Sequence, residues 1–235
     1  MKKKIIITGG LGYIGTELCK IYSGISWNTD ITVIDNRFIS ERVNQLRNWN
    51  MNFVHGDILD KDLIKKYCTD ADVVHHLAGV TDVPRVKSES NSENDTKIKL
   101  VAEDGTQNIL DVITDECKII LPSTHVVYEG LEKVKTDILE EEETKPVLAY
   151  ASSKAINEEQ LKKSGKNFII LRLGSVYGYS SDTARIDILP NLFSKISSQD
   201  GTLKLFAGGR QLKSLVPLID VARCFKFMEE RNDIS

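Results

Sequence analysis

The chain has 235 residues, of which 41% are hydrophobic and 28% charged, as is typical of a globular protein with one large domain or one domain and part of a second. A net charge of −3 excludes the basic surface that nucleic acids or anionic membranes need, and no apolar run is long enough for a signal peptide or a membrane span. The four cysteines lie far apart without a CxxC pair, so we expect free thiols in a reducing cytoplasm.

The first predicted strand is the uncharged run Ile5–Ile7, which is typical of a strand buried on both faces of a parallel sheet. Glycines then recur at every third position, Gly9, Gly12 and Gly15, and a helix is predicted to follow. Gly9 would allow a sharp turn, Gly12 would let backbone N–H groups approach a pyrophosphate, and Gly15 would let the helix pack on the strand. This spacing differs from the GxGxxG fingerprint, so alone it leaves a plain turn equally open.

The second predicted strand, Asp30–Asp35, ends on a carboxylate about 20 residues after the glycines, where dinucleotide-binding folds place an acid. Asp35 can accept hydrogen bonds from both hydroxyls of an adenosine ribose, and it would repel the 2′-phosphate of NADP. The strand, the turn, the helix and the acid together predict a dinucleotide site that favours NAD over NADP. Arg37, two residues later, is a feature that could soften this preference.

The remaining pattern alternates strands and helices. Further strands are predicted at Asn52–Asp57, Asp72–Val80, Lys118–Leu121, Phe168–Arg172 and Thr202–Phe206. Further helices are predicted at Lys61–Tyr67, at Ile98–Ile113, from Tyr150, at Ile186–Ser197 and from Leu218. Such repeats require a parallel sheet with helices on both faces, so the predicted fold class is α/β with a Rossmann-type doubly wound sheet.

Two adjacent histidines, His75 and His76, stand in one of these strands. Successive side chains on a strand point to opposite faces, so the pair cannot bind one metal ion. With no cluster of cysteines or carboxylates nearby, we predict structural roles for both and no metal site.

A tyrosine and a lysine, Tyr150 and Lys154, are four residues apart and would share one helix face. A free tyrosine is a poor base because its pKa is about 10, but an ammonium and an oxidised nicotinamide ring beside it would lower that pKa. The spacing is common, and an accidental pair on a solvated helix is the alternative. The hydroxyls of Ser123 and Thr124 favour chemistry, because they end a predicted strand at the edge where the glycine turn lies.

Seven motifs follow one another in an order that resembles a known family. They are TGGLGYIG at Thr8–Gly15, VIDN at Val33–Asn36, GDILD at Gly56–Asp60, HLAG at His76–Gly79, STHVVY at Ser123–Tyr128, YASSK at Tyr150–Lys154 and LRLGSVYG at Leu171–Gly178. The chain resembles the extended short-chain dehydrogenases/reductases of the NAD-dependent epimerase/dehydratase group, which act on nucleotide-sugars.

The resemblance implies a role for each matching residue. Tyr150 would be the acid/base, Lys154 would bind the nicotinamide ribose, and Thr124 would hydrogen-bond the reacting sugar hydroxyl. Tyr150 would remove the hydroxyl proton while hydride passes from the same carbon to NAD, and an epimerase would return the hydride to the other face. The cofactor would contact Gly9, Gly12, Tyr13, Ile14, Gly15, Asp35, Asn36, Asp57, Ile58, Leu77, Ala78 and Gly79, together with Tyr150 and Lys154.

Departures from the family narrow the expected reaction. The 4,6-dehydratases carry Asp-Glu after the threonine, where this chain has His125 and Val126. Elimination of water needs an acid and a base there, so a dehydratase is disfavoured, and decarboxylases are disfavoured on similar grounds. Substrate contacts are implied at Thr124, at Ser175 in place of an asparagine, and at Lys213 in place of a bidentate arginine.

The resemblance also divides the chain. It implies an NAD-binding domain at 1–172 and a substrate-binding region at 173–235, of which about 213–230 returns to the first domain. Family members continue further, so we expect this second region to be small, either truncated or naturally short. The resemblance further implies a cytoplasmic homodimer formed through the helices near 98–113 and 150–162.

The sequence as a whole predicts an NAD-dependent nucleotide-sugar epimerase with no nucleic-acid or membrane partner. Two alternatives stay open. One is a nucleotide-sugar 4-keto reductase or dehydrogenase of the same family. The other is an NAD-binding sensor or scaffold without turnover, which is favoured by the short C-terminal region and by Ala102, where the family has an asparagine.

Overall fold

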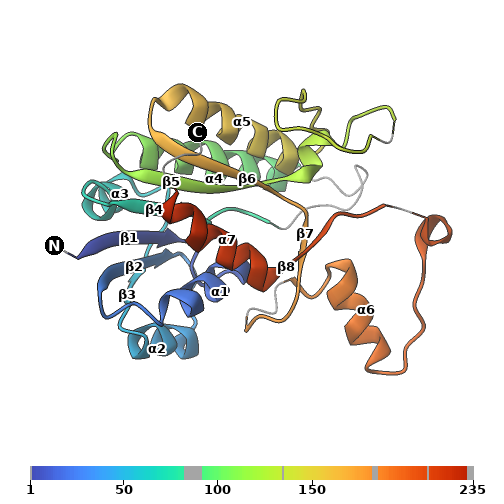
Figure 1. Cartoon of the computed structure of the whole chain (residues 1–235), viewed down its shortest axis with the longest axis horizontal. Helices are drawn as coiled ribbons and strands as arrows, with labels where there is room; N and C mark the ends of the chain where they lie inside the picture. The colour runs from blue at the N-terminus through green and yellow to red at the C-terminus, as the bar shows by residue number, and fades with distance from the viewer. Residues whose placement is uncertain (1, 82–91, 134, 182–184, 211, 232–235) are drawn as a thin grey trace.

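The computed structural model describes residues 2–81, 92–133, 135–181, 185–210 and 212–231 (Figure 1). Six parallel strands form one sheet in the order β3-β2-β1-β4-β5-β6. Their bounds are β1 Lys3–Thr8, β2 Thr29–Asp35, β3 Asn52–His55, β4 Val73–His76, β5 Lys118–Thr124 and β6 Asn167–Leu173. The order reverses between β1 and β4, which confirms the predicted doubly wound α/β class and marks the usual place for a ligand.

Helices cover both faces of the sheet (Figure 1). One face carries α1 (Tyr13–Tyr22), α2 (Ser40–Asn48) and α7 (Leu218–Glu230), and the other carries α3 (Lys61–Cys68), α4 (Ser92–Leu110) and α5 (Ala149–Ser164). Ile5 and Ile7 point into the core under α1, α2 and α7, and Ile6 points into the core under α3, α4 and α5. All three side chains are completely buried. The uncharged opening run is therefore required because this central strand has no solvent-facing side.

A smaller group of elements lies beyond the carboxyl ends of the strands (Figure 1). It contains β7 (Ser175–Tyr177), which pairs in parallel with β8 (Leu215–Pro217), and the helix α6 (Leu189–Ser197). The helix predicted at 186–197 is present, but in the structure it begins three residues later, at Leu189. The strand predicted at 202–206 is wrong, because residues 201–205 are all exposed and no described strand lies beside them to pair with their backbone.

The last helix, α7, returns to the main sheet and packs against α1. Lys118 of β5 donates hydrogen bonds from Nζ to the carbonyl oxygens of Glu229 (3.1 Å) and Arg231 at the end of that helix. The carboxylate of Glu229 forms ion pairs with Lys3 (2.6 Å) and Lys226 (3.2 Å). A cation at the C-terminal end of a helix also complements the helix dipole, so these contacts fix α7 on the sheet.

The adjacent histidines have separate polar partners on opposite faces of β4. His75 Nε2 lies 2.7 Å from the hydroxyl of Tyr22, and His76 lies between the hydroxyls of Thr8 (2.8 Å) and Thr106 (3.0 Å). Burial lowers the pKa of each histidine to about 3, so both rings are neutral at pH 7.

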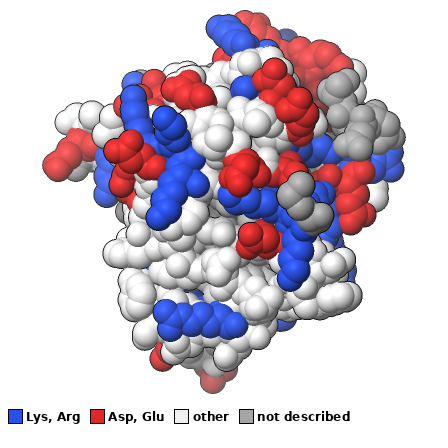
Figure 2. All heavy atoms as spheres, turned by 90° about the vertical axis from the view of Figure 1, so that its left-hand side faces the viewer, with Lys and Arg blue, Asp and Glu red and all other residues white. Residues whose placement is uncertain are grey.

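The surface at the amino ends of the strands carries mixed charge. Lysines and arginines are interleaved with aspartates and glutamates over the upper part of this face (Figure 2). No helix in the described part of the chain has both the length and the apolar character needed to cross a bilayer.

Candidate active site

The turn between β1 and α1 is packed too closely for side chains at its glycine positions. Gly9 has φ +69°, and a Cβ there would lie 2.6 Å from the backbone nitrogen of Ala78 at the end of β4. A Cβ on Gly15 would lie 2.4 Å from the carbonyl oxygen of Gly9. Gly12 precedes the first residue of α1 and has no side chain over the unpaired N–H groups of that helix. The turn thus exposes backbone donors and the positive end of a helix dipole at the reversal point of the sheet.

Sequence reasoning missed two further residues of this turn. A Cβ on Gly10 would lie 2.3 Å from Cγ1 of Val33 in β2, so any side chain there would displace Val33. The hydroxyl of Thr8 accepts a hydrogen bond from Ala78 N (3.2 Å) and so ties the turn to β4. The motif TGG contained both residues, but their partners lie on other strands and became visible only with the sheet assembled.

The predicted adenosine-binding residues come together at the ends of β2 and β3. Asp35 is 6% exposed, and its Oδ2 accepts a hydrogen bond from Leu11 N in the glycine turn (2.9 Å). The next residue, Asn36, donates from Nδ2 to Oδ2 of Asp57 (3.0 Å). The structure therefore brings the three polar residues to one edge, although they are up to 22 positions apart in the sequence.

The apolar residues predicted to contact the cofactor differ in where their side chains lie. Ile58 is 4% exposed and packs beneath α4, where a Cβ on Gly105 would lie 2.3 Å from its Cδ1. Leu77 and Ala78 continue the chain from β4 and are hydrogen-bonded to Thr8. A Cβ on Gly79 would have no atom of the described residues within 4 Å, so in the described part of the chain this glycine borders open space.

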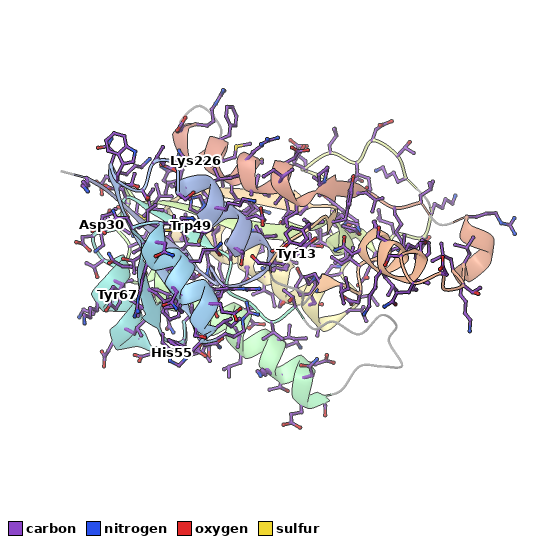
Figure 3. The ribbon with its side chains drawn as sticks, turned by 90° about the horizontal axis from the view of Figure 1, so that it is seen from below. Tyr13, Asp30, Trp49, His55, Tyr67 and Lys226 are labelled. Atoms are coloured by element: carbon purple, nitrogen blue, oxygen red, sulfur yellow. The ribbon has the colours of Figure 1, made fainter. Side chains whose placement is uncertain are left out.

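Two residues at the start of α1, Tyr13 and Ile14, have side chains that are used for packing. The phenol of Tyr13 donates to the carbonyl oxygen of Gly178 and accepts from Asn191 Nδ2 (3.0 Å), which links α1 to α6 (Figure 3). Ile14 packs against the core beside α7. Only the backbone of these two residues is left to face a ligand at the turn.

The predicted catalytic residues lie on two elements in contact. Tyr150 and Lys154 occupy the first two turns of α5, which packs against β5 and the short 3₁₀ helix η2 (His125–Tyr128). Thr124 ends β5 and is 8% exposed, and its Oγ1 accepts a hydrogen bond from Val126 N (3.3 Å). Across the described residues, no hydrogen bond joins these three side chains directly.

Lys154 is a largely buried residue whose ammonium has no hydrogen-bond or ion-pair partner among the described residues. It is 8% exposed, and its Nζ donates no hydrogen bond to any residue that the structure describes. Burial lowers its pKa to about 8, while the carboxylate of Glu158 one turn later opposes that shift. Because an unpaired buried charge is costly, this arrangement is typical of a group that receives its hydrogen bonds from a ligand.

The phenol of Tyr150 has a raised pKa. Burial raises it, and the guanidinium of Arg185 is the group that opposes the shift. The lowering that the sequence predicts from Lys154 and an oxidised nicotinamide together stays a prediction, because in the chain alone desolvation of the phenolate is the largest effect on this pKa.

Arg185 is a residue of the site region that sequence reasoning did not identify. It donates from Nη1 to the carbonyl oxygen of Thr81 (2.8 Å), which follows β4, and it lowers the pKa of both Tyr13 and Tyr150. It therefore lies close enough to both phenols to act on them by charge. It belongs to no local motif, so no signal in the sequence pointed to it.

A buried ion pair positions α5 against the sheet. Nη2 of Arg172 in β6 lies 2.6 Å from Oε2 of Glu158, whose side chain is 2% exposed. Ser123, beside Thr124, also donates to Glu158. Burial alone would raise the pKa of Glu158, but the hydrogen bonds from Arg172 and Ser123 outweigh it and lower the pKa. The pair thus links α5, β5 and β6 two turns after Tyr150.

The two remaining substrate candidates are brought to neighbouring strands. Ser175 opens β7, and its backbone N–H donates to the carbonyl oxygen of Ser214 (2.7 Å), directly after Lys213. Lys213 is exposed. β7 therefore carries Ser175 next to the segment that contains Lys213, although the two residues are 38 positions apart in the sequence.

A sheet that reverses at a glycine turn, beside a helix with a tyrosine and a lysine one turn apart, is the arrangement of short-chain dehydrogenase/reductase folds. The family model described as "NAD dependent epimerase/dehydratase family" matches residues 5–234. The chain belongs to the NAD-dependent epimerase/dehydratase family, and the resemblance inferred from the motifs is confirmed.

Individual relatives carry several activities. The chain is 35% identical to CDP-paratose 2-epimerase of Salmonella typhi over 144 residues, which are 56% of this chain and 40% of that protein. It is 26% identical to UDP-N-acetyl-alpha-D-glucosaminuronate decarboxylase of Bacillus cytotoxicus, over 98% of this chain and 69% of that protein. The chain thus spans between 40% and 69% of the length of these two curated relatives.

A solved structure has the same fold. UDP-glucuronic acid 4-epimerase from Bacillus cereus, in complex with UDP-glucuronic acid and NAD, matches 98% of this chain and 74% of its own, with a TM-score of 0.79 and 24% identity. At this identity the likeness shows the shared fold.

Proposed function

We propose that the chain binds NAD and serves as the cofactor and catalytic part of a nucleotide-sugar epimerase. The observation that carries the proposal is the unpartnered ammonium of Lys154, which is buried one helical turn from Tyr150. Hydroxyl groups of a ribose would supply the acceptors that the described protein groups do not. The family membership and the NAD held by the Bacillus cereus relative support the same conclusion.

The residues present fit this cofactor at its other end as well. The turn at Gly9–Gly15 has no room for side chains at Gly9, Gly10 and Gly15, and it presents backbone donors to an anion such as a pyrophosphate. Asp35 stands at the end of β2, where it can receive ribose hydroxyls. Asn36 and Asp57 lie beside it, and Leu77, Ala78 and Gly79 border the space next to the turn. When bound, NAD would accept hydride from a sugar carbon and return it.

In this proposal the chain's own groups handle the proton. Tyr150 takes the proton of the sugar hydroxyl and gives it back after the keto-sugar has turned over. Lys154 holds the cofactor ribose, and its charge next to the site favours the phenolate. Thr124 orients the sugar hydroxyl from the end of β5, while Ser175 and Lys213 contact the substrate from the smaller group of elements.

Elimination and decarboxylation have less support from the residues after Thr124. Val126 offers no acid or base, and Nδ1 of His125 lies 3.0 Å from the carbonyl oxygen of Leu173, so that ring nitrogen is occupied by the backbone. An epimerase needs neither group, because one acid/base and a hydride carrier suffice. We therefore place a 4-keto reductase or dehydrogenase as the second candidate and a dehydratase after it.

The partner proposed for assembly is a second copy of the chain. Ile156 on α5 and Leu100 on α4 are exposed apolar residues on helices that pack on each other. A surface hollow lined by Ser152, Ile156 and Gln160 runs along the outer side of α5. Size-exclusion chromatography with light scattering tests the proposal, and a monomer at high concentration would contradict it.

Calorimetric titration with NAD, followed by incubation with UDP-, GDP-, dTDP- and CDP-sugars, tests the function. Interconversion of sugars without net NADH formation identifies an epimerase, whereas stoichiometric NADH identifies a dehydrogenase. Tyr150→Phe should bind NAD normally and lose about 100- to 10,000-fold in turnover, as expected for loss of a general acid/base. Tight NAD binding with no change in any sugar would support a sensor, and absence of NAD binding would end the proposal.

A further inference from the structure

The carboxylate of Glu158 in α5 accepts hydrogen bonds from two neighbouring strands of the sheet. Its Oε1 accepts from the hydroxyl of Ser123 in β5 and from Nε of Arg172 in β6 (3.0 Å), and its Oε2 accepts from Nη2 of the same arginine (2.6 Å). The side chain of Glu158 is 2% exposed and that of Arg172 is 16% exposed. A bidentate pair that is mostly shielded from water holds both side chains in one geometry.

The remaining nitrogen of Arg172 extends the contacts to the segment that precedes α5. Its Nη1 donates to the hydroxyl of Tyr128 in η2 and to the carbonyl oxygen of Glu140 (2.8 Å), and the guanidinium lies 5.2 Å from the centre of the Tyr128 ring. A guanidinium suits this place because its planar fork donates several hydrogen bonds in fixed directions. Through Arg172, the carboxylate of Glu158 therefore connects α5 with β6, with η2 and with the loop near residue 140.

The hydrogen bond from Ser123 anchors the residue that directly precedes Thr124. Tyr150 stands on the same helix as Glu158, two turns earlier, which is about 12 Å along the helix axis. Because this helical segment is stiff, the contact at Glu158 determines where the Tyr150 end of α5 lies relative to Thr124. A displacement of about 1 Å between reacting groups is enough to cost a large factor in rate.

Glu158 also places a negative charge one helical turn from the ammonium of Lys154. The carboxylate raises the pKa of Lys154, against the burial that lowers it to about 8. The other groups around this ammonium add little charge of their own. Burial keeps the ring of His76 on β4 and the phenol of Tyr150 neutral, Arg172 on β6 is paired with Glu158 itself, and α4 meets α5 through uncharged backbone carbonyl groups.

We propose that Glu158 is a positioning residue of the proposed reaction, which holds Thr124 and Tyr150 at one separation and keeps the ammonium of Lys154 charged. Its carboxylate oxygens are used by Ser123 and Arg172, so it acts through other residues and does not touch substrate or cofactor. The inference rests on the proposed function and deepens it, because it gives a role in the site to a residue outside the seven sequence motifs.

Glu158→Gln tests the charge, because the amide keeps the length of the side chain and an oxygen that can accept from Ser123. Isothermal titration with NAD at a series of pH values measures the effect without reference to turnover. We expect the wild-type affinity to fall as the pH rises through about 8, where Lys154 loses its proton. In Glu158→Gln the fall should occur at a pH lower by about half a unit or more, because a favourable charge has been removed.

Ser123→Ala tests the position, because it removes the hydrogen bond to β5 and leaves the charge of Glu158 in place. The turnover number should drop about tenfold, since Thr124 and Tyr150 are held less precisely. The Michaelis constant for the sugar, the affinity for NAD and its pH profile should change less than about threefold.

Glu159→Gln is the matched control, because it makes the same chemical change at a glutamate that is 54% exposed and pairs with surface lysines. It should leave the NAD profile and the turnover unchanged. A Glu158→Gln protein whose NAD affinity is weakened equally at every pH, or not at all, would overturn the inference, and so would an unchanged turnover number in Ser123→Ala. In each of these cases the wild type still binds NAD and the proposed function stands. If the wild type does not bind NAD, the proposed function and the inference both fail.

Discussion

Helices α1 and α6 are similar in length and both have one apolar side, yet their packing differs completely. Seven of the ten residues of α1 are buried against the sheet and α7, whereas none of the nine residues of α6 is buried. The first helix borders the proposed cofactor site, and the second belongs to the group that would carry substrate contacts. The difference teaches that the position of the cofactor residues is determined by a continuous core, whereas α6 has no fully buried residue and is linked to α1 by the polar contact between Asn191 and Tyr13.

The ion pair of α5 gives the largest expected effect on folding. Glu158→Ala would leave Arg172 partly buried without its carboxylate, which costs about 3–5 kcal/mol of unfolding free energy. Glu159→Ala is the matched control, because the neighbouring glutamate is 54% exposed and pairs only with surface lysines, so it should cost less than about 1 kcal/mol. Urea denaturation measures both. Equal losses would mean that α5 is not fixed by this pair.

Matching leucines test the comparison between the two helices directly. Leu18 in α1 is completely buried, so Leu18→Ala should cost about 2–5 kcal/mol through lost burial and a residual cavity. Leu189 in α6 is 44% exposed, and Leu189→Ala should cost less than about 1 kcal/mol. The urea concentrations at which half of each variant is unfolded give the difference in stability loss between Leu18→Ala and Leu189→Ala. A loss at Leu189 as large as that at Leu18 would show that α6 is covered in solution by something outside the described residues.

The sequence predicted the buried core correctly and was less reliable for the exposed region around α6. The run Ile5–Ile7, the glycines after it and the acid at Asp35 are local patterns, and each predicts its structure because its physical requirement lies within a few residues. The strand at 202–206 was predicted from a similar local pattern and was wrong, because a strand also needs a neighbour to pair with. The alternation of predicted strands and helices therefore identifies the central strands of a sheet more reliably than strands outside it.

The parts of the candidate site that the sequence missed depend on distant partners. Glu158 and Arg172 are ordinary charged residues until α5 lies on β6, and Arg185 acts on two phenols from a segment with no motif. The burial that raises the pKa of Tyr150 in the chain alone also depends on distant partners, since the extent of burial is a property of the assembled fold. Whether the predicted residues bind cofactor and substrate stays a prediction.

Lys154 allows a test of whether a residue of the proposed site lowers the free energy of unfolding. Burial lowers its pKa from 10.5 to about 8, so below pH 8 the folded chain keeps a charge that water would solvate better. Lys154→Met should raise the unfolding free energy by about 2–3 kcal/mol at pH 7 without cofactor. Between pH 8 and 10.5 the unfolded state binds more protons, so the wild type gains stability with pH and the advantage of the variant shrinks.

Urea denaturation of the wild type and of Lys154→Met between pH 7 and 10.5 measures whether the stability difference shrinks as the pH rises. Lys162→Met, on the same helix with a side chain 49% exposed, should show no such pH-dependent difference. A Lys154→Met protein that is less stable than wild type at pH 7 would contradict the view that the ammonium is unpartnered. The same variant should bind NAD more weakly, so stability and binding would move in opposite directions.

Two glycines give the smallest and most local contrast. Gly10→Ala would place a methyl group 2.3 Å from Val33 Cγ1 in a close-packed core, which should cost about 1–3 kcal/mol. Gly79→Ala would place its methyl group where no described residue lies within 4 Å, so the stability should stay within about 0.5 kcal/mol of wild type. Urea denaturation separates the two variants on stability, and titration with NAD separates them on binding.

The binding result decides what the space beside Gly79 is for. If NAD occupies it, Gly79→Ala weakens NAD binding with the fold intact, because the methyl group takes room that the cofactor needs. If NAD affinity and stability are both unchanged, that space belongs to solvent, and the end of β4 contributes to the site only through its backbone. A stability loss in Gly79→Ala would instead mean that the loop after β4 packs more tightly than the described contacts indicate, and the contrast with Gly10 would fall.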